Sequence, residues 1–350
     1  MESLKSVNWP ILTVQQDILI QALKNTESYD EKVDDIRLVQ THISYVFLTG
    51  KYAYKIKKPV DFGFLDFTTL RKRRYYCYEE LRLNRRLCGD MYIAVLPITV
   101  RSGAVKISGD GRIVEYTLKM REMPQDALMS KMLSENRVAV SHIEEMASIL
   151  SAFHRSAETN NEIRRYGSLS TITYNWVENF EQTRDFIGKT ISEYEYTLIR
   201  ERVDWFLRNR RHLFRMRMKT SKIRECHGDL HSGNIFIADK IYIYDAIEFN
   251  RRFRCSDTAS DIAFLLMDLE FKGKDKLANV FLDRYLELSG ESQDFLDVLP
   301  FYKCYRAYVR GKVTSFKLAD PHIPDQEKEE ARDTAKRYFD LSLEYANLMR

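Results

Sequence analysis

The sequence predicts an α+β fold in two parts: a small antiparallel sheet with one long helix, then a larger and mainly helical part. Runs rich in β-branched and aromatic residues, separated by tight turns, occupy residues 34–57 and 92–120. From residue 127 onward, apolar residues recur at helical spacing with few interruptions. A polar loop and a short hairpin at 226–249 interrupt this helical pattern. These three observations together predict the fold class.

The first part, which we take as residues 1–123, opens with a helical pattern around residues 15–24. A long helix is expected at 69–88, capped at its start by Thr68 or Thr69. Segments dense in β-forming residues predict strands at 36–39, 45–48, 52–56, 92–96 and 113–120. This part is therefore expected to be a small antiparallel sheet that carries one important helix.

The second part, residues 124–350, is expected to begin where Pro124 ends the last strand. Two short β-forming runs around the turn 239–240 predict a hairpin in the middle of this part. Periodic apolar positions predict helices at 141–159, twice within 174–218, and at 258–272, 275–289, 293–317 and 325–349.

Composition and charge exclude several classes of protein. With 350 residues, 44% of them hydrophobic, the chain can form one large domain or two lobes with a real core. A net charge of only +4 argues against a dedicated nucleic-acid-binding protein. Five scattered cysteines without a C-x-x-C pair indicate a reducing, cytoplasmic environment, without disulfides or a zinc site. The apolar run 263–267 is too short to cross a membrane.

The loop and hairpin contain the clearest chemical signature in the chain. His227, Asp229 and Asn234 follow the spacing H-x-D-x-x-x-x-N, and Asp245 follows Asn234 by eleven residues. Phosphoryl transfer needs such a set, because the protein mainly positions a nucleophile and neutralises phosphate charge with metal ions. Asp229 is expected to accept or orient the proton of an attacking hydroxyl. Asn234 and Asp245 are expected to supply oxygen ligands to Mg²⁺.

The motif HGDLHSGN, with glycine after the first histidine, resembles the corresponding motif of the aminoglycoside phosphotransferase and choline kinase family more than that of the protein kinases, which have HRD. The resemblance covers roughly residues 35 to 320. The sequence around the motif is similar to that of a bacterial and archaeal branch of the family. The segments that carry it are 41–50, 54–61, 79–87, 245–250 and 257–270. It implies the bilobal, protein-kinase-like fold and ATP as a cofactor. Many members of the branch continue into a P-loop domain, which we expect this chain to lack.

The resemblance also assigns residues of the first part to the nucleotide. Lys55 matches the strand lysine that binds the α- and β-phosphates, and it shares a strand face with Lys57, which is a rival together with Lys58. Glu80 lies on the apolar stripe of the helix at 69–88, where a carboxylate needs a partner, so we expect it to pair with Lys55. Glu79 is expected to face solvent instead.

Further nucleotide contacts are expected in two connecting segments. Ser44 and nearby backbone N–H groups are expected to contact phosphate, in the turn where kinases have a glycine-rich loop. Arg121 and Met123 are expected to bind adenine through their backbone groups, because kinase-like folds place the hinge between the lobes there.

Five residues are expected to bind substrate or support the site. His227 belongs to the motif, and Glu248 is expected near a second metal or a substrate cation. Asp261, at a helix start, is expected to be a structural carboxylate bound to N–H groups of the catalytic loop. Arg306 and Arg310 share a helix face, and they are expected either to meet substrate or phosphate or to form salt bridges with helix acids.

The predicted function is therefore ATP- and Mg²⁺-dependent phosphorylation of a hydroxyl on a small-molecule acceptor. One alternative is a Ser/Thr protein kinase, which would phosphorylate itself. Another is a nucleotide-binding pseudokinase that works as an interaction module, and the complete set of Asp229, Asn234 and Asp245 argues against it.

Overall fold

The computed structural model describes residues 12–321 and 323–349, with side chains from residue 16 onward. The chain divides into two compact units: unit 1 is residues 1–127 and 238–250, and unit 2 is residues 128–237 and 251–350. This division differs from the predicted boundary after residue 123. The segment 238–250 belongs to unit 1 because Asp245, Ala246 and Glu248 all bond to side chains of that unit.

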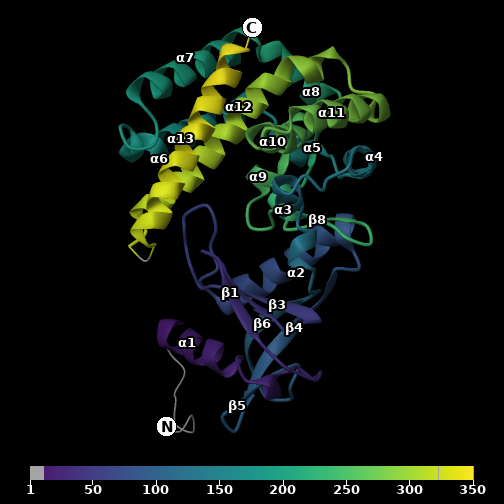
Figure 1. The fold of residues 1–350 in the computed structure, drawn as a ribbon, viewed down its shortest axis with the longest axis vertical. Coiled ribbons are helices and arrows are strands. Elements are labelled where there is room, and N and C mark those ends of the chain that lie inside the picture. Colours follow the sequence, from purple (N-terminus) through teal and green to yellow (C-terminus); the bar gives the residue numbers. More distant parts are fainter. Residues whose placement is uncertain (1–11, 322, 350) are drawn as a thin grey trace. The chain divides into compact units, whose positions relative to one another are not determined.

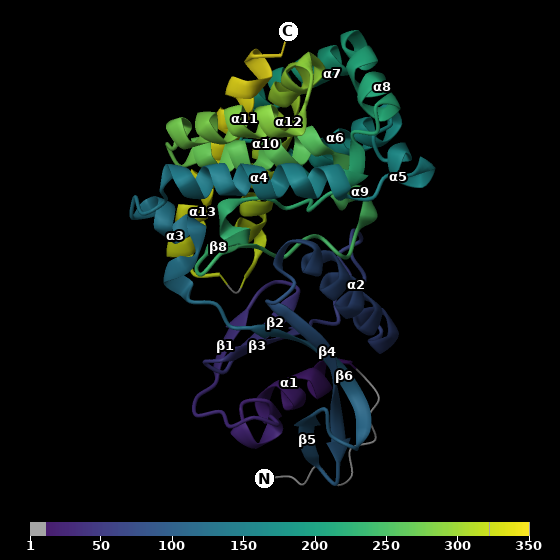
Figure 2. The same cartoon turned by 90° about the vertical axis from the view of Figure 1, so that its right-hand side faces the viewer.

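Unit 1 is built on a six-stranded antiparallel sheet with the strand order β1-β2-β3-β6-β4-β5. The sheet is drawn in Figures 1 and 2, and β2 is labelled in Figure 2. The strand β5 is absent from the prediction, and β4 is longer than predicted. The two strands are joined by Ser102 and Gly103, both with positive φ, and this turn lacks the usual Asn-Gly or Asp-Gly signal. The strands are β1 (Arg37–Gln40), β2 (Ser44–Leu48), β3 (Tyr52–Lys57), β4 (Tyr92–Arg101), β5 (Ala104–Ile107) and β6 (Arg112–Arg121).

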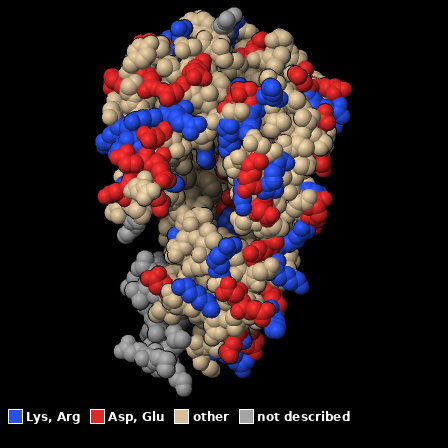
Figure 3. Space-filling view, viewed as in Figure 1, with Lys and Arg blue, Asp and Glu red and all other residues tan. Residues whose placement is uncertain are grey.

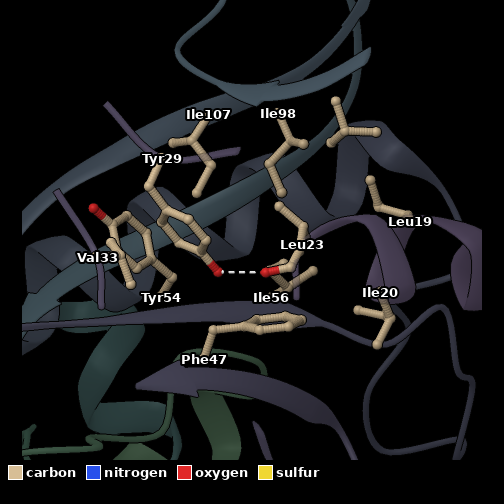
Figure 4. Packing of buried hydrophobic residues seen from close by; sticks show 11 residues of the cluster. Leu19, Ile20, Leu23, Tyr29, Val33, Phe47, Tyr54, Ile56, Ile98 and Ile107 are labelled. Atoms are coloured by element: carbon tan, nitrogen blue, oxygen red, sulfur yellow. Dashed lines mark hydrogen bonds between the residues drawn. The ribbon is translucent and has the colours of Figure 1, made fainter. Parts of the chain in front are cut away.

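Apolar side chains of helix α1 (Leu12–Ala22) and of the sheet form one core of unit 1 (Figure 4). Leu19 of α1 and Leu23, the residue directly after α1, lie in the same cluster as Phe47 and Ile56 of the sheet, and all four are buried. Tyr29 donates from Oη to the carbonyl of Leu23 at 2.8 Å, which satisfies the end of the helix. Each fully buried aliphatic side chain contributes about 1.5–3 kcal/mol, so these contacts hold α1 against the sheet.

Helix α2 (Leu70–Cys88) belongs to the same unit and carries the predicted glutamate. Its N-cap is Thr69, whose side chain accepts a hydrogen bond from the N–H of Lys72 at 3.2 Å. Its buried positions include Cys77, Glu80 and Asn84, which recur at helical spacing. Glu80 therefore lies on the buried face of the helix.

Unit 2 is mainly helical, with α10 (Thr258–Phe271) buried at its centre; the residues from Thr258 to Leu269 are all buried. The predicted helices are present, and Figures 1 and 2 show α12 and α13 side by side. The others are α3 (Met129–Ser134), α4 (Val140–Ser156), α5 (Asn161–Arg165), α6 (Leu169–Thr183), α7 (Glu193–Asn209), α8 (Arg211–Lys219), α9 (Arg251–Arg254), α11 (Asp275–Ser289), α12 (Gln293–Ser315) and α13 (Asp325–Asn347).

Short strands complete the fold. In unit 2, β7 (Ile223–Glu225) pairs antiparallel with β10 (Cys255–Asp257), and β8 (Ile235–Ile237) follows the polar loop. In unit 1, β9 (Ile241–Ile243) leads directly to Asp245. On the face drawn in Figure 3, basic and acidic side chains are intermixed. In the part of the chain that the structure describes, no helix has the length and apolar character needed to span a bilayer.

Candidate functional site

Strand β3 and helix α2 bring a lysine and a glutamate together inside unit 1. The Nζ of Lys55 lies 2.8 Å from Oε1 of Glu80 and 2.6 Å from Oδ1 of Asp245. Glu80 is fully buried, whereas Glu79 is partly exposed and pairs with Arg82 at 3.0 Å. The contact that the sequence predicts between Lys55 and Glu80 is therefore present, and Asp245 joins it.

A second lysine completes this cluster. The Nζ of Lys57 lies 2.7 Å from Oε2 of Glu80 and also contacts Oε1 of Glu248, and all three side chains are buried. Glu80 thus bridges Lys55 and Lys57. From the sequence, Lys57 is a rival candidate for the role of Lys55, whereas in the structure both lysines pair with the same glutamate. The shared strand face was a signal that both side chains point the same way. Glu248, predicted beside a metal or a substrate cation, is paired instead with an ammonium group, because a buried carboxylate needs a counter-charge.

The charges in the cluster hold each other in the ionised state. Burial opposes the charge of Lys55, but the carboxylates of Asp245 and Glu80 outweigh it and raise the pKa of this lysine well above its ordinary value. Burial also opposes the charge of Glu80, but Lys55 and Lys57 outweigh it and lower the pKa of Glu80 to about 2. Lys55 is therefore a fixed cation next to the carboxylate of Asp245.

The backbone around Asp245 is positioned by α2 and by β4. Asp245 has a left-handed conformation (φ 63°), which aspartate adopts more readily than most residues. The N–H of Asp245 donates to Oη of Tyr92 at 3.3 Å, and the N–H of Ala246 donates to Oδ1 of Asn84 at 2.9 Å. Asn84 also donates to the carbonyl of Glu80 at 2.8 Å. One turn of α2 therefore positions both Glu80 and Asp245.

The carboxylate of Asp245 fits a metal ligand. Its side chain is 41% exposed, and its Oδ1 accepts a hydrogen bond from Lys55. Its Oδ2 has no hydrogen-bond partner among the described residues. A carboxylate oxygen is the kind of hard ligand that Mg²⁺ prefers. Asp245 can therefore offer an oxygen to a cation without losing an existing bond.

Ser44 does not lie where its predicted role requires. It is the first residue of β2, opposite Lys57 in the strand register, rather than a residue of the preceding turn. The side chain is fully buried, and its hydroxyl has no hydrogen-bond partner within the described chain. A fully buried hydroxyl is not accessible to a phosphate at the surface of the unit, so the structure argues against a contact through the side chain of Ser44.

The two residues predicted to bind adenine differ in their backbone bonding. The N–H of Arg121 donates to the carbonyl of Met91 at 2.8 Å, so the sheet already uses it, and the guanidinium pairs with Asp239 at 2.8 Å. The N–H of Met123 has no hydrogen-bond partner within residues 12–321 and 323–349. A backbone contact with adenine therefore stays a prediction for Met123, and the structure argues against one through the N–H of Arg121.

The carboxylate of Asp229, in unit 2, accepts one hydrogen bond on Oδ2 and has the imidazole of His231 near the same oxygen. The Nδ2 of Asn234 donates to Oδ2 of Asp229 at 3.0 Å, and Nε2 of His231 lies 3.4 Å from the same oxygen. The other oxygen, Oδ1, has no hydrogen-bond partner in the described part of the chain. Burial opposes the charge, but His231 and Arg310 outweigh it and hold the pKa of Asp229 below its usual range. An ionised oxygen is therefore available to accept a hydrogen bond.

Asn234 also fits the role of a metal ligand. Its Nδ2 donates to both the carbonyl and the carboxylate of Asp229, each at 3.0 Å, which fixes the plane of the amide. The amide oxygen of Asn234 has no hydrogen-bond partner among the residues that the structure describes. That Asn234 and Asp245 bind the same Mg²⁺ stays a prediction.

Helix α10 anchors the loop that carries Asp229. The carboxylate of Asp261 accepts the N–H of His227 at 2.9 Å and the N–H of Gly228 at 2.8 Å, which is the contact that the sequence predicts. His227 is fully buried, and its Nδ1 accepts the N–H of Asp229 at 3.3 Å. His227 therefore supports the loop from inside, which is one of the two roles that the sequence predicts for it.

The two arginines of α12 have different surroundings. Arg306 is buried and donates to the carbonyl groups of Gly228 and Ser260 at 2.9 and 3.1 Å. It therefore anchors the loop through carbonyl groups, and within the described residues it forms no salt bridge. A contact of Arg306 with substrate stays a prediction. Arg310 lies one turn further along, partly exposed, and its charge lowers the pKa of Asp229. A contact of Arg310 with substrate or phosphate stays a prediction.

No protein-family model matches the chain. Two curated proteins, the uncharacterized protein Rv2004c of Mycobacterium tuberculosis (strain ATCC 25618 / H37Rv) and the uncharacterized protein Mb2027c of Mycobacterium bovis, are each 31% identical to it over 317 residues. The match covers 90% of this chain and 60% of theirs, so the chain spans about 60% of the length of these relatives.

Several solved structures share the fold. A microcompartment-associated aminopropanol kinase has a TM-score of 0.53 and 13% identity, with 96% of this chain and 98% of that chain covered. A choline/ethanolamine kinase family protein from Mesorhizobium loti has a TM-score of 0.50 and 11% identity, with 96% and 100% covered. A putative aminoglycoside phosphotransferase from Ralstonia eutropha has a TM-score of 0.50 and 11% identity, with 94% and 98% covered.

A likeness at this level of identity establishes the fold. The predicted α+β, bilobal, protein-kinase-like fold is therefore confirmed, and so is the resemblance of this fold to choline kinases and aminoglycoside phosphotransferases.

Proposed function

We propose that the chain transfers the γ-phosphoryl group of ATP, in the presence of Mg²⁺, to a hydroxyl of a small molecule. The observation that carries this proposal is the carboxylate of Asp229, which is ionised and held on one oxygen while the other has no partner in the described chain. The buried pair of Lys55 and Glu80, with Asp245 beside it, supports a phosphate and cation site.

The structural neighbours support the same class of activity. Those with this fold are kinases or kinase-like proteins, among them the aminopropanol kinase. An amicoumacin kinase of the same fold, 13% identical with a TM-score of 0.50, was solved in complex with AMP-PNP, Ca²⁺ and Ami. A nucleotide and a divalent cation at the proposed site agree with that complex.

Each residue of the site would contribute through binding or orientation. Lys55, held by Glu80, would bind the nucleotide phosphates. Asp245 and Asn234 would hold Mg²⁺, which neutralises phosphate charge when bound. Oδ1 of Asp229 would accept the hydrogen bond of the acceptor hydroxyl and orient its oxygen for attack. The transition state of phosphoryl transfer is loose, so orientation matters more than early deprotonation, and a low pKa of Asp229 suits that role.

The binding half of the proposal is tested by thermal unfolding with ATP, with and without Mg²⁺. Ligand at about a hundred times its dissociation constant adds roughly 2.7 kcal/mol to the free energy of unfolding, which is an easily measured shift. We expect a Mg²⁺-dependent shift in the wild type, its loss in Asp245→Ala, and its retention in Asp110→Ala. Asp110 is an exposed carboxylate of unit 1 that pairs with Arg101 and serves as the control. No shift in the wild type would refute the nucleotide site.

The catalytic half is tested by ADP formation with a panel of amino alcohols, amino sugars and aminoglycosides. Asp229→Asn is expected to keep the Mg²⁺-ATP shift and to lose turnover by about a hundredfold, because a misplaced attacking oxygen costs about that much. Retained turnover in this variant would contradict the role of Asp229. Phosphate found on the chain itself by mass spectrometry would favour a protein kinase, and ATP binding without any transfer would favour a pseudokinase.

A further inference from the structure

The imidazole of His231 has a defined tautomer. His231 is the N-cap of the short 3₁₀ turn Ser232–Asn234, and its Nδ1 accepts the N–H of Gly233 at 3.0 Å. A ring nitrogen that accepts a hydrogen bond carries no proton, so the proton of the neutral ring lies on Nε2. Nε2 is the atom that faces the carboxylate of Asp229.

The ring is also fixed by packing on two sides. A Cβ atom on Gly233 would lie 2.8 Å from Cε1 and 2.9 Å from Nδ1 of His231, closer than real side chains approach. The absence of a side chain at Gly233 is therefore what allows the ring to lie there. The ring of Phe264, from the buried helix α10, is 5.4 Å away between centroids. His231 is held in one orientation by residues that take no part in the proposed reaction.

The contact with Asp229 is directed at one of its two oxygens. Nε2 of His231 lies 3.4 Å from Oδ2, the same oxygen that accepts Nδ2 of Asn234 at 3.0 Å. Contacts of this kind are often long without substrate and tighten when substrate binds. The hydrogen bond from Asn234 and the nearby imidazole of His231 both lie on the Oδ2 side of the carboxylate, which leaves Oδ1 to accept from an approaching group.

We propose that His231 is a positioning residue for the phosphoryl transfer described above. Its Nε2–H holds Oδ2 of Asp229, so that Oδ1 accepts the hydrogen bond of the attacking hydroxyl. The imidazole transfers no proton in this role and touches neither nucleotide nor acceptor. The inference rests on the proposed function, in which Asp229 orients the acceptor hydroxyl, because His231 is proposed to orient Asp229.

The replacement His231→Asn separates this role from a structural one. Asparagine is among the best N-cap residues, so its side-chain oxygen can still accept the N–H of Gly233. It is too short to reach Asp229. The same replacement at His142 is the matched control, because Nδ1 of His142 also accepts a backbone N–H near a helix start, that of Ala139 at 3.2 Å.

The assay is hydrolysis of Mg²⁺-ATP with water as the acceptor, together with the melting temperature of each variant. We expect His231→Asn to lower kcat by about tenfold to a hundredfold, because small misplacements of reacting groups cost that much. The KM for ATP and the melting temperature are expected to match those of His142→Asn.

A second route to the same contact is Gly233→Ala, whose new methyl group overlaps the imidazole. It is expected to lower kcat in the wild type and to have little further effect in the His231→Asn background, where the shorter side chain leaves room. The effects of the two replacements on kcat are therefore expected to be non-additive. Because each replacement disturbs the same contact by a different route, the inference can still be tested if one variant folds poorly.

The outcomes distinguish the inference from the proposed function. Wild-type turnover that is lost in Asp229→Asn but unchanged in both His231→Asn and Gly233→Ala would overturn the role of His231 alone. A wild type without Mg²⁺-dependent ATP binding and turnover would overturn the proposed function, and the role of His231 with it. A fall in kcat at unchanged KM and melting temperature supports the inference.

Discussion

Replacing Glu80 with glutamine is expected to destabilise unit 1 and to weaken ATP binding at the same time. Glu80 is fully buried, 2.8 Å from Lys55 and 2.7 Å from Lys57. Glutamine keeps the volume but removes the charge, so both ammonium groups lose a partner in a place that water does not reach. Removing one partner of a buried ion pair costs about 3–5 kcal/mol. The two lysines lower the pKa of Glu80 to about 2 against the effect of burial, so the folded unit favours the charged carboxylate that glutamine removes.

Glu79→Gln is the matched control, because Glu79 is the next residue on the same helix and pairs with Arg82 near the surface. An exposed pair of this kind contributes about 0.2–1 kcal/mol. For a unit of this size, a loss of about 3–5 kcal/mol lowers the melting temperature by roughly 6–20 °C, whereas the control is expected to change it by no more than about 4 °C. The stabilisation by Mg²⁺-ATP is expected to persist in Glu79→Gln and to fall in Glu80→Gln. Equal effects of the two replacements would refute the assignment of Glu80 as the common counter-charge of both lysines.

Two further predictions concern unit 2. Burial lowers the pKa of Lys312 to about 8, and Lys312 Nζ donates to amide oxygens of Asn179 and Gln182, both at 2.7 Å. This pKa lies below the unfolded value of 10.5, so the stability of the wild type relative to Lys312→Met is expected to rise by up to about 3 kcal/mol as the pH rises from about 8 to 10.5. Urea unfolding at pH 7 and pH 10 measures this difference, and a pH-independent difference would contradict it. Gly228→Ala is expected to lower the melting temperature and the turnover, because φ is +88° and the new Cβ would lie 3.0 Å from backbone atoms. Gly188→Ala is the control, because Gly188 also has a positive φ (+77°) but has open space around it, so alanine there causes backbone strain without a clash. An equal loss of stability in the two variants would rule out a steric clash at Gly228.

Most of the secondary structure and part of the site follow from short-range patterns in the chain. The strands and helices were predictable because apolar side chains recur at periods of 2 and 3.6 residues. The same two periods place Lys55 and Lys57 on one face of β3 and Glu80 on the buried face of α2. The choice of Lys55 as the partner of Glu80 comes from the family resemblance. The spacing of Asp229 and Asn234 predicted a polar loop that carries both residues, and the structure adds that their side chains are hydrogen-bonded to each other.

The sequence by itself thus determined the fold class, the loop that carries Asp229 and the pair of Lys55 and Glu80. Only the tertiary structure decided the pairing of Lys57 with Glu248, which lie 191 residues apart, and the anchoring of Gly228 by Arg306, 78 residues away. It also decided that the segment 238–250 packs with unit 1. The physical reason is that a buried charge or carbonyl group must find a partner, but any of several residues can satisfy it. Which one does so depends on how distant elements pack, and no local period encodes that choice.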